Sequence, residues 1–237
     1  MAKRTCLILL IFSLLTMLTA QAQSDIILAH DDSTLNLEGQ PTIECVLNKM
    51  KTQYSFIKVP WKRAQFGTKD GNYAGFFMAS QNSQRNSYAT FSQPFMKVVW
   101  VYVIRKGSDI TTEDSNFGDK LFASKIGSSR QNWLLKKYNK KEISHKIFSA
   151  VTSVQLLKML SLGRVDIVLE NQANLKKITL GKNVDLSEFD ILPALEKPLG
   201  VYFSHAFLKQ NPNFLNAYNT TIEVCIGKDS NGTKIRF

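Results

Sequence analysis

The sequence predicts an α/β fold built as two lobes. Short β-branched segments alternate along the chain with amphipathic helical segments, and this order produces mostly parallel sheets flanked by helices. The sequence contains no evident repeat or low-complexity segment. We therefore expect two lobes joined by crossing strands rather than two domains separated by a linker.

Seven short segments have the apolar, β-branched composition of strands. They are residues 25–29, 54–59, 75–79, 98–104, 121–126, 165–169 and 199–203. A polar stretch at residues 106–120 contains Gly, Ser, Asp and Asn and lacks periodicity, so it predicts a surface loop just beyond the longest strand.

Three helices have recognisable ends. Pro41 can open the first helix, because its missing N–H costs nothing in a first turn. Ser153 is a candidate N-cap of a second helix, and Gly163 suits its left-handed end. Pro212 is expected to open the last helix. The apolar positions of the first and last helices are Ile43, Val46, Leu47 and Met50, and Phe214, Leu215, Tyr218, Ile222 and Cys225.

Residues 1–22 are expected to be a cleavable secretory signal peptide. Lys3 and Arg4 precede an apolar run at residues 6–15, and Ala-Gln-Ala at residues 20–22 forms a small-x-small cleavage pattern. A membrane anchor would need roughly 18 consecutive apolar residues, and polar side chains interrupt this segment earlier. We therefore expect a soluble, exported protein cleaved near Ala22.

The mature chain is basic. The 28 Lys and Arg and 19 Asp and Glu residues that follow residue 22 leave a net charge of +9, which favours anionic partners. Export and the dispersed placement of the lysines argue against nucleic acid. The surplus is then either a solvated surface or one that faces an anionic envelope.

Cysteine and histidine usage limits the covalent and metal chemistry. Cys6 leaves with the signal peptide, so Cys45 and Cys225 form an even pair in a compartment where disulfides persist. Two buried thiols are the alternative to a bridge. We expect no metal site and no cofactor, because no histidine lies close to a cysteine or to a second histidine. The three histidines are His30, His145 and His205.

A series of short phrases occurs in a characteristic order. They are PWKRA at 60–64, GFF at 75–77, Ser80 followed by Arg85, YATFSQPF at 88–95, a glycine at 127 in a small polar turn, KML at 158–160 with GRVD at 163–166, and NP at 211–212. Together they resemble the bacterial extracellular solute-binding protein family 3, over essentially the whole mature chain.

The resemblance implies a type II periplasmic binding protein, in which two α/β lobes joined by a two-segment hinge close over a small ligand. Lobe 1 would comprise residues 23–104 and 196–237, and lobe 2 residues 105–195. The implied function is periplasmic capture of a small carboxylate-bearing solute, an amino acid or related metabolite, by a monomer that serves an inner-membrane ABC permease. The alternatives are a solute sensor with a separate signalling partner and a dehydratase-like periplasmic enzyme.

Arg85 is the main candidate for ligand binding. In the family, an arginine at this place holds the ligand's α-carboxylate, and a guanidinium suits that task because its planar fork donates two parallel hydrogen bonds and stays charged. Ser80 and its neighbours would add donors at the head of a short helix. The competing interpretation is an arginine that only caps a solvated turn.

Further contacts are expected from both lobes. In lobe 1 they are Trp61, Phe77, Ala79, Ser80 and Asp31. Asp31 and Asp32 directly follow the first strand, where they either offer a polar group to the cleft or lie in a solvated loop. The two aromatic residues either stack on the ligand or fill the lobe core. In lobe 2 the contacts come from the turn at residues 126–132, namely Ser128, Ser129, Arg130 and Asn132. Ser129 or Asn132 is expected to cap the next helix, with or without a ligand contact.

The sequence departs from the family at the residue that usually receives the ligand's ammonium. Amino-acid binders place an aspartate there, whereas this chain has Asn171, preceded by Glu170. Either Glu170 replaces the missing acid or the ligand has no ammonium group. Arg130 is also unusual and suggests a second negative charge on the ligand.

The resemblance also gives the cysteines a role. Cys45 lies in the predicted first helix and Cys225 in the last, and in this fold the chain end often returns to the first lobe. A disulfide between them would attach the last helix to lobe 1.

Overall fold

The computed structural model describes residues 26–31, 34–111, 119–138, 146–180 and 184–226. The expected signal peptide, Asp32 and residues 112–118 of the predicted loop lie outside these ranges. Among the described helices, none is both long and apolar enough to cross a membrane.

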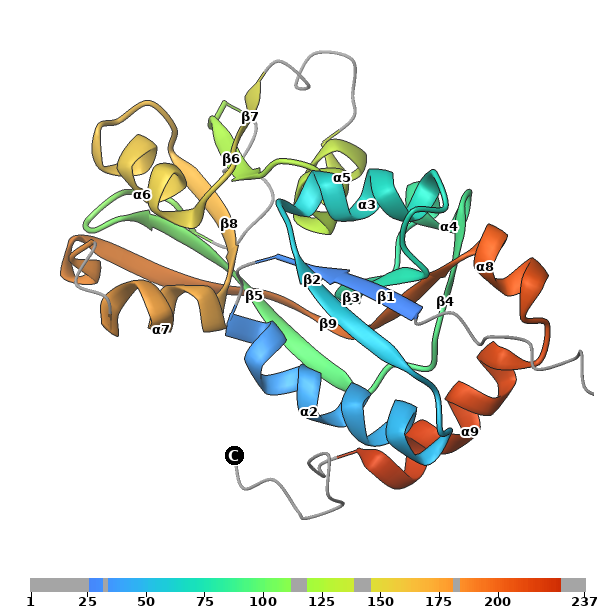
Figure 1. Cartoon of the computed structure of the whole chain (residues 1–237). Coiled ribbons are helices and arrows are strands. Elements are labelled where there is room, and N and C mark those ends of the chain that lie inside the picture. Colours follow the sequence, from blue (N-terminus) through green and yellow to red (C-terminus); the bar gives the residue numbers. More distant parts are fainter. Residues whose placement is uncertain (1–25, 32–33, 112–118, 139–145, 181–183, 227–237) are drawn as a thin grey trace, which may run out of the picture.

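A single mixed sheet runs through the described part of the chain (Figure 1). Its strand order is β2-β1-β3-β9-β5-β8-β6-β7, and β4 pairs with β9 beside this path. The strands are β1 Ile26–His30, β2 Tyr54–Lys58, β3 Gly75–Ser80, β4 Ala89–Phe91, β5 Met96–Arg105, β6 Phe122–Lys125, β7 Ile147–Ala150, β8 Ile167–Asn171 and β9 Phe189–Ser204.

Two antiparallel strands join the halves of the molecule. β5 and β9 pair from Met96 and Leu199 at one end to Arg105 and Phe189 at the other. On one side of them lie β1–β4, where β1 is parallel to both β2 and β3. On the other side lie β6–β8, where β6 is parallel to both β7 and β8. We call the first group of strands, with its helices, lobe 1, and the second group, with its helices, lobe 2.

Helices cover both faces of the sheet (Figure 1). In lobe 1, α2 and α9 lie on one face and α3 and α4 on the other. The helices are α2 Thr34–Lys49, α3 Trp61–Lys69, α4 Ser83–Asn86, α5 Ser129–Lys137, α6 Ser153–Ser161, α7 Gln172–Leu180, α8 His205–Gln210 and α9 Phe214–Cys225, with a 3₁₀ turn η3 at Leu186–Glu188.

The core follows from the alternation of side chains along each strand. In β1, Leu28 packs in the cluster formed by α2 and α9, whereas its neighbour Ala29 packs on the opposite face. In β3, Phe77 and Phe76 divide between the same two clusters. All four side chains are fully buried. The central residues of β1 and β3 therefore face the core on both sides of the sheet, which explains why both strands are apolar stretches in the sequence.

Most of the predicted strands are confirmed within one or two residues, but two are missing from the prediction. β4 and β7 have three and four residues, too few for a periodic signal. β9 extends ten residues further towards its N-terminus than expected. That part alternates between exposed and half-buried positions and contains Pro193 and Pro198, which count against a strand in sequence.

The predicted helix starts need correction. Pro41 lies inside α2, which begins at Thr34. Thr152 is the N-cap of α6, since its side chain accepts from the Gln155 N–H in a reciprocal capping box, and Ser153 is the first helical residue. Pro212 precedes α9 by two residues.

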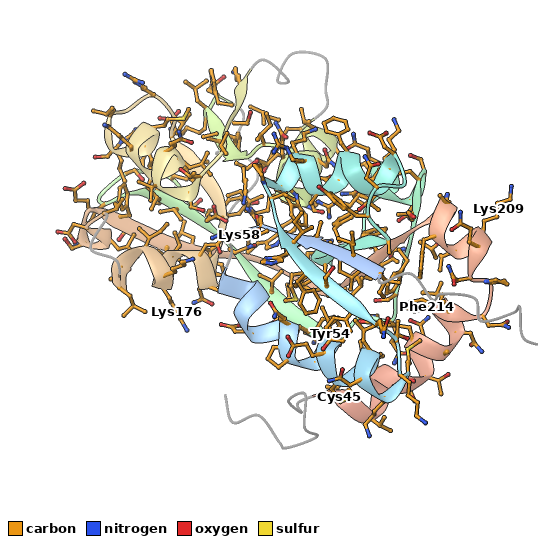
Figure 2. All side chains as sticks on the ribbon, in the orientation of Figure 1. Cys45, Tyr54, Lys58, Lys176, Lys209 and Phe214 are labelled. Atoms are coloured by element: carbon orange, nitrogen blue, oxygen red, sulfur yellow. A yellow bond between two sulfur atoms is a disulfide. The ribbon has the colours of Figure 1, made fainter. Side chains whose placement is uncertain are left out.

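A disulfide joins the two long helices of lobe 1. Cys45 on α2 and Cys225 on α9 have Cα atoms 5.8 Å apart and are separated by 180 residues in the chain. Both are buried, and Cys45 lies where the two helices meet (Figure 2). The bridge closes nearly the whole described chain into one loop.

Removing the bridge should lower the free energy of unfolding. We expect a Cys45→Ala, Cys225→Ala double variant of residues 23–237 to lose about 2–4 kcal/mol in urea unfolding followed by circular dichroism, because its unfolded chain is less constrained. Reductant should lower the unfolding midpoint of the wild type and leave the variant unchanged. Equal midpoints without reductant would contradict the stabilising role.

Candidate ligand-binding cavity between the lobes

A cavity lies where the two lobes meet the crossing strands. It has about 50 Å³ of free space, room for about four water-sized groups. Its lining residues are Asp31, Trp61, Met78, Ala79, Ser80 and Arg85 from lobe 1, Lys125, Ser128, Ser129, Arg130, Asn171 and Asn174 from lobe 2, and Val98, Trp100 and Leu199 from β5 and β9.

The sheet topology brings these polar groups together. The carboxyl ends of β1, β3, β6 and β8 all contribute to the lining, through Asp31, Ser80, Lys125 and Asn171. In α/β folds the crevice beyond the carboxyl ends of parallel strands is the usual ligand site. The cavity therefore lies at the position that the strand order favours.

Arg85 connects the two lobes through neutral acceptors. Its Nη1 donates to Ser80 O in lobe 1 and to Ser129 Oγ in lobe 2, each at 2.7 Å. Longer contacts of 3.4 Å reach Gln65 Oε1 from Nε and Gly127 O from Nη2. Within the described chain, no carboxylate pairs with this guanidinium.

The guanidinium of Arg85 is buried against two aromatic rings, and this environment affects its pKa. The residue is 1% exposed, and its guanidinium lies 5.1 Å from the Trp61 ring centroid and 5.6 Å from that of Phe76. Desolvation lowers the pKa of Arg85 to about 10, opposed by Tyr202 and Tyr88. The side chain is still charged at neutral pH, so the cavity wall holds a buried cation that none of the described carboxylates neutralises.

A second cation is fixed on the lobe 2 side. Arg130 Nη2 pairs with Glu170 Oε1 at 2.9 Å, and its Nη1 donates to Asn171 Oδ1 at 2.7 Å. Arg130 Nε is buried and has no hydrogen-bond partner among the described residues. A buried donor without a partner costs free energy, so this atom favours an acceptor supplied from the cavity.

Glu170 is enclosed behind this arginine. The residue is fully buried. Besides Arg130, its carboxylate accepts from Asn171 N at 2.6 Å, Asn174 Nδ2 at 3.1 Å and Ser153 Oγ at 2.6 Å. Four donors match the approximately four lone-pair sites of a carboxylate. Glu170 therefore positions Arg130 and does not line the cavity.

An ion pair crosses the cavity between the lobes. Asp31, directly after β1, pairs with Lys125 at the end of β6. Their side chains are 10% and 17% exposed, respectively. This pair joins lobe 1 to lobe 2 independently of Arg85.

The carbonyl of Gly127 is a third connection between the lobes. It accepts from Trp61 Nε1 at 3.2 Å and from Gln65 Nε2 at 3.1 Å, both on α3. Gly127 has φ of +66°, a conformation that favours glycine. A Cβ at this position would lie 2.5 Å from Lys62 Cε in lobe 1, an atom near the end of a flexible side chain that can move aside.

The structure brings together most of the predicted site residues. Those that line the cavity are Asp31, Trp61, Ala79, Ser80, Arg85, Ser128, Ser129, Arg130 and Asn171. Three others lie elsewhere. Phe77 is in the lobe 1 core, Glu170 is behind Arg130, and Asn132 donates to Gln84 Oε1 across the exposed rim at 3.0 Å.

The position of Phe77 has a local cause. The pairing of β3 with β9 shifts register between Phe77 and Ala79, and Met78 in between has φ of +55°. Phe77 consequently packs against His30 and Phe56, with ring centroids 5.1 and 5.2 Å away. Met78 takes the place at the cavity wall.

The start of α5 also differs from the prediction. Ser128 is the N-cap, with its side chain accepting from the Gln131 N–H at 3.1 Å. Ser129, expected as a possible cap, instead bonds to Arg85, and Asn132 lies one turn further along. The capping and ligand-facing roles are therefore divided between two adjacent serines.

Six lining residues were missed in the sequence. They are Met78, Val98, Trp100, Lys125, Asn174 and Leu199. Lys125 had a usable signal, because it lies at the end of a predicted strand, as Asp31 does. The apolar members on β5 and β9 look like ordinary core residues, and only the crossing of the strands brings them to the site.

Solved structures share this fold at low sequence identity. One is the arginine-, lysine- and histidine-binding protein ArtJ of Geobacillus stearothermophilus, with a TM-score of 0.69 at 12% identity over 84% of this chain and 88% of that one. Another is a Streptococcus pneumoniae ABC uptake transporter substrate-binding protein with bound histidine, with a TM-score of 0.68 at 18% identity over 84% and 85%.

A histidine kinase sensor domain with similarity to periplasmic binding proteins has a TM-score of 0.71 at 12% identity over 85% of this chain and 90% of that one. No protein-family model and no curated protein matches the sequence. The likenesses establish the type II periplasmic binding protein fold.

Substituting Gly127 should destabilise the protein through its backbone conformation. We expect Gly127→Ala to lose about 1–2 kcal/mol in urea unfolding, because alanine is strained at a φ of +66°. Gly163→Ala is the matched control, since Gly163 has φ of +67° and open space around it, and it should lose a similar amount because the Lys62 side chain can move away from a new Cβ at position 127. An unchanged stability of Gly127→Ala would contradict the backbone requirement.

Neutralising Glu170 should destabilise the fold strongly. We expect Glu170→Gln to lower the free energy of unfolding by about 3–5 kcal/mol, because it leaves the buried Arg130 charge unpaired. Glu196→Gln is the control, since Glu196 pairs with Lys97 at 3.7 Å on the exposed surface and should change stability by less than about 1 kcal/mol. Equal losses in urea unfolding would show that the buried pair has no special weight.

Proposed function

We propose that the protein is a periplasmic solute-binding protein that captures a small carboxylate-bearing solute between its lobes. The observation that carries this proposal is the buried, uncompensated guanidinium of Arg85 at the cavity wall. A buried charge is costly unless it is paired. A carboxylate would supply the missing counterion and match the planar fork of the guanidinium.

The proposed mechanism is capture by closure. An open form exposes the cavity, the solute bridges Arg85 and the lobe 2 donors, and the closed population rises because the ligand contacts both lobes only in that form. Ser129 supports this role, because its hydroxyl already meets Arg85 across the interface. Release would follow when the lobes separate.

Proteins of the same fold support a transport role. ArtJ is described as binding arginine, lysine and histidine, and the pneumococcal protein as part of an ABC uptake transporter. We propose that this protein serves an inner-membrane ABC permease as a monomer, after export through its expected signal peptide. The sensor-domain neighbour favours a second candidate, solute sensing through a separate signalling protein.

The dehydratase alternative loses its candidate acid. That hypothesis depended on Glu170 as a general acid or base facing the cavity. Glu170 is fully buried, has four donors on its carboxylate and does not line the cavity. Binding without turnover is therefore the function that the site supports better.

A ligand screen with an Arg85 variant tests the proposal. We expect that, in a thermal-shift panel of amino acids, 2-oxo acids, dicarboxylates, polyamines and opines, every stabilising compound carries a carboxylate. In calorimetry, Arg85→Ala should weaken that compound at least about 30-fold, since one partner of a buried charge pair is lost.

Two further variants make the result specific. Arg85→Lys keeps the charge but loses the fork, and should bind between wild type and Arg85→Ala. Arg63→Ala removes an exposed arginine of α3 outside the cavity and should bind like wild type. A stabilising compound that binds all four proteins equally would remove Arg85 from the site and overturn the proposal.

A further inference from the structure

We propose that the captured solute carries a carboxylate but no ammonium group, because Lys125 supplies an ammonium from the protein inside the cavity. This inference rests on the proposed function, since it concerns the same site. It narrows the solute class from amino acids to small monocarboxylates, with 2-oxo acids as the best match. Three described groups are candidates to receive a ligand ammonium, namely Asp31, Glu170 and Asn171.

The first acid is already occupied by a lysine. Asp31 is the one carboxylate among the described residues that line the cavity. Lys125 reaches it from lobe 2, so the pair forms across the space that a ligand would enter. An α-amino acid would have to displace this lysine to place its own ammonium on Asp31.

The second acid has no acceptor capacity left. Glu170 receives two nitrogens and a hydroxyl from side chains and one backbone N–H. Four donors fill its lone-pair sites. Arg130 also lies between this carboxylate and the cavity, because Arg130 lines the cavity and Glu170 does not. A ligand ammonium near Glu170 would meet a guanidinium first.

The third group offers donors rather than acceptors. Asn171 replaces an acid at the end of β8, and its Oδ1 accepts from Arg130 at 2.7 Å. With the carbonyl oxygen engaged, the amide can offer its N–H groups to the cavity. Arg130 Nε is another buried donor without a described partner. This side of the cavity therefore favours an acceptor oxygen on the solute.

The charges of the site also favour a 2-oxo acid. Among the charged residues that the structure describes at the cavity, Lys125 pairs with Asp31 and Arg130 with Glu170, which leaves Arg85 without a paired carboxylate. One surplus positive charge matches a monoanion and not a zwitterion of zero net charge. A 2-oxo acid supplies one carboxylate for Arg85 and one uncharged acceptor oxygen for the Arg130 side. Apolar walls from Met78, Val98 and Leu199 suit its short carbon chain.

Matched probe pairs test the inference directly. We would measure calorimetric affinities at pH 7.5 for pyruvate and L-alanine, 2-oxobutyrate and L-2-aminobutyrate, and 2-oxoisovalerate and L-valine. The members of each pair share a carbon skeleton and differ at the ammonium-bearing carbon. In wild type we expect the 2-oxo acid of at least one pair to bind at least about tenfold more tightly than its amino acid, because like-charge juxtaposition is costly.

Variants at Lys125 should shift this preference. Lys125→Met removes the protein's ammonium from the cavity and with it the like charge that a ligand ammonium would meet. The amino acid of the pair that shows the preference should therefore gain at least about tenfold in affinity relative to its 2-oxo partner. Lys125→Gln is a second variant that keeps a polar side chain in case methionine disturbs folding. Lys120→Met is the control, because Lys120 pairs with exposed Asp109 outside the cavity and should keep the wild-type preference.

The outcomes separate this inference from the proposed function. An amino acid that binds wild type as tightly as its 2-oxo partner, and is lost in Arg85→Ala, overturns the inference and leaves carboxylate capture intact. A preference unchanged in both Lys125 variants also overturns it. If all six probes fail to bind wild type, the inference is overturned, and the wider panel with Arg85→Ala then decides the proposed function separately.

Discussion

The organisation of the site depends on one buried guanidinium that no carboxylate of the described residues pairs with. Arg85 is held by two strong hydrogen bonds to neutral oxygens, one from each lobe, and by the faces of two aromatic rings. These contacts fix its position but do not neutralise it. The protein thereby keeps a positive charge out of water at the point where the lobes meet, and an anion is the partner that this arrangement lacks.

The rest of the fold positions this charge. β3 ends at Ser80, whose carbonyl holds one side of the guanidinium, and β6 leads into the turn whose Ser129 holds the other. β5 and β9 connect the two supports, so a change in the angle between the lobes alters both contacts together. The Cys45–Cys225 bridge joins α2 to α9 in lobe 1, and neither cysteine lines the cavity.

Parts of this arrangement could be predicted from the sequence, and the reasons are physical. Strands such as β1 and β3 are buried on both faces and stand out as apolar runs, so the polar residues at their ends, Asp31 and Ser80, were found. The exchange of Phe77 for Met78 depends on a register shift and one positive φ, which no local pattern encodes. The Asp31–Lys125 pair joins residues 94 apart in the chain, and only the packing of the lobes creates it.

The contacts that join the lobes and the group proposed to select the ligand are different parts of the protein. Gly127 O and the Asp31–Lys125 pair join the lobes with protein atoms alone, so the closed form has favourable contacts before a solute enters. A ligand shifts the population only by its differential affinity for that form, and in the proposed mechanism the differential comes from pairing with Arg85. A solute that also carried an ammonium would compete with Lys125 for Asp31, weakening one closing contact while forming another. In the proposed mechanism, an anion without that group adds its contact to those already present, and the charge pattern of the cavity then disfavours zwitterions while it favours closure.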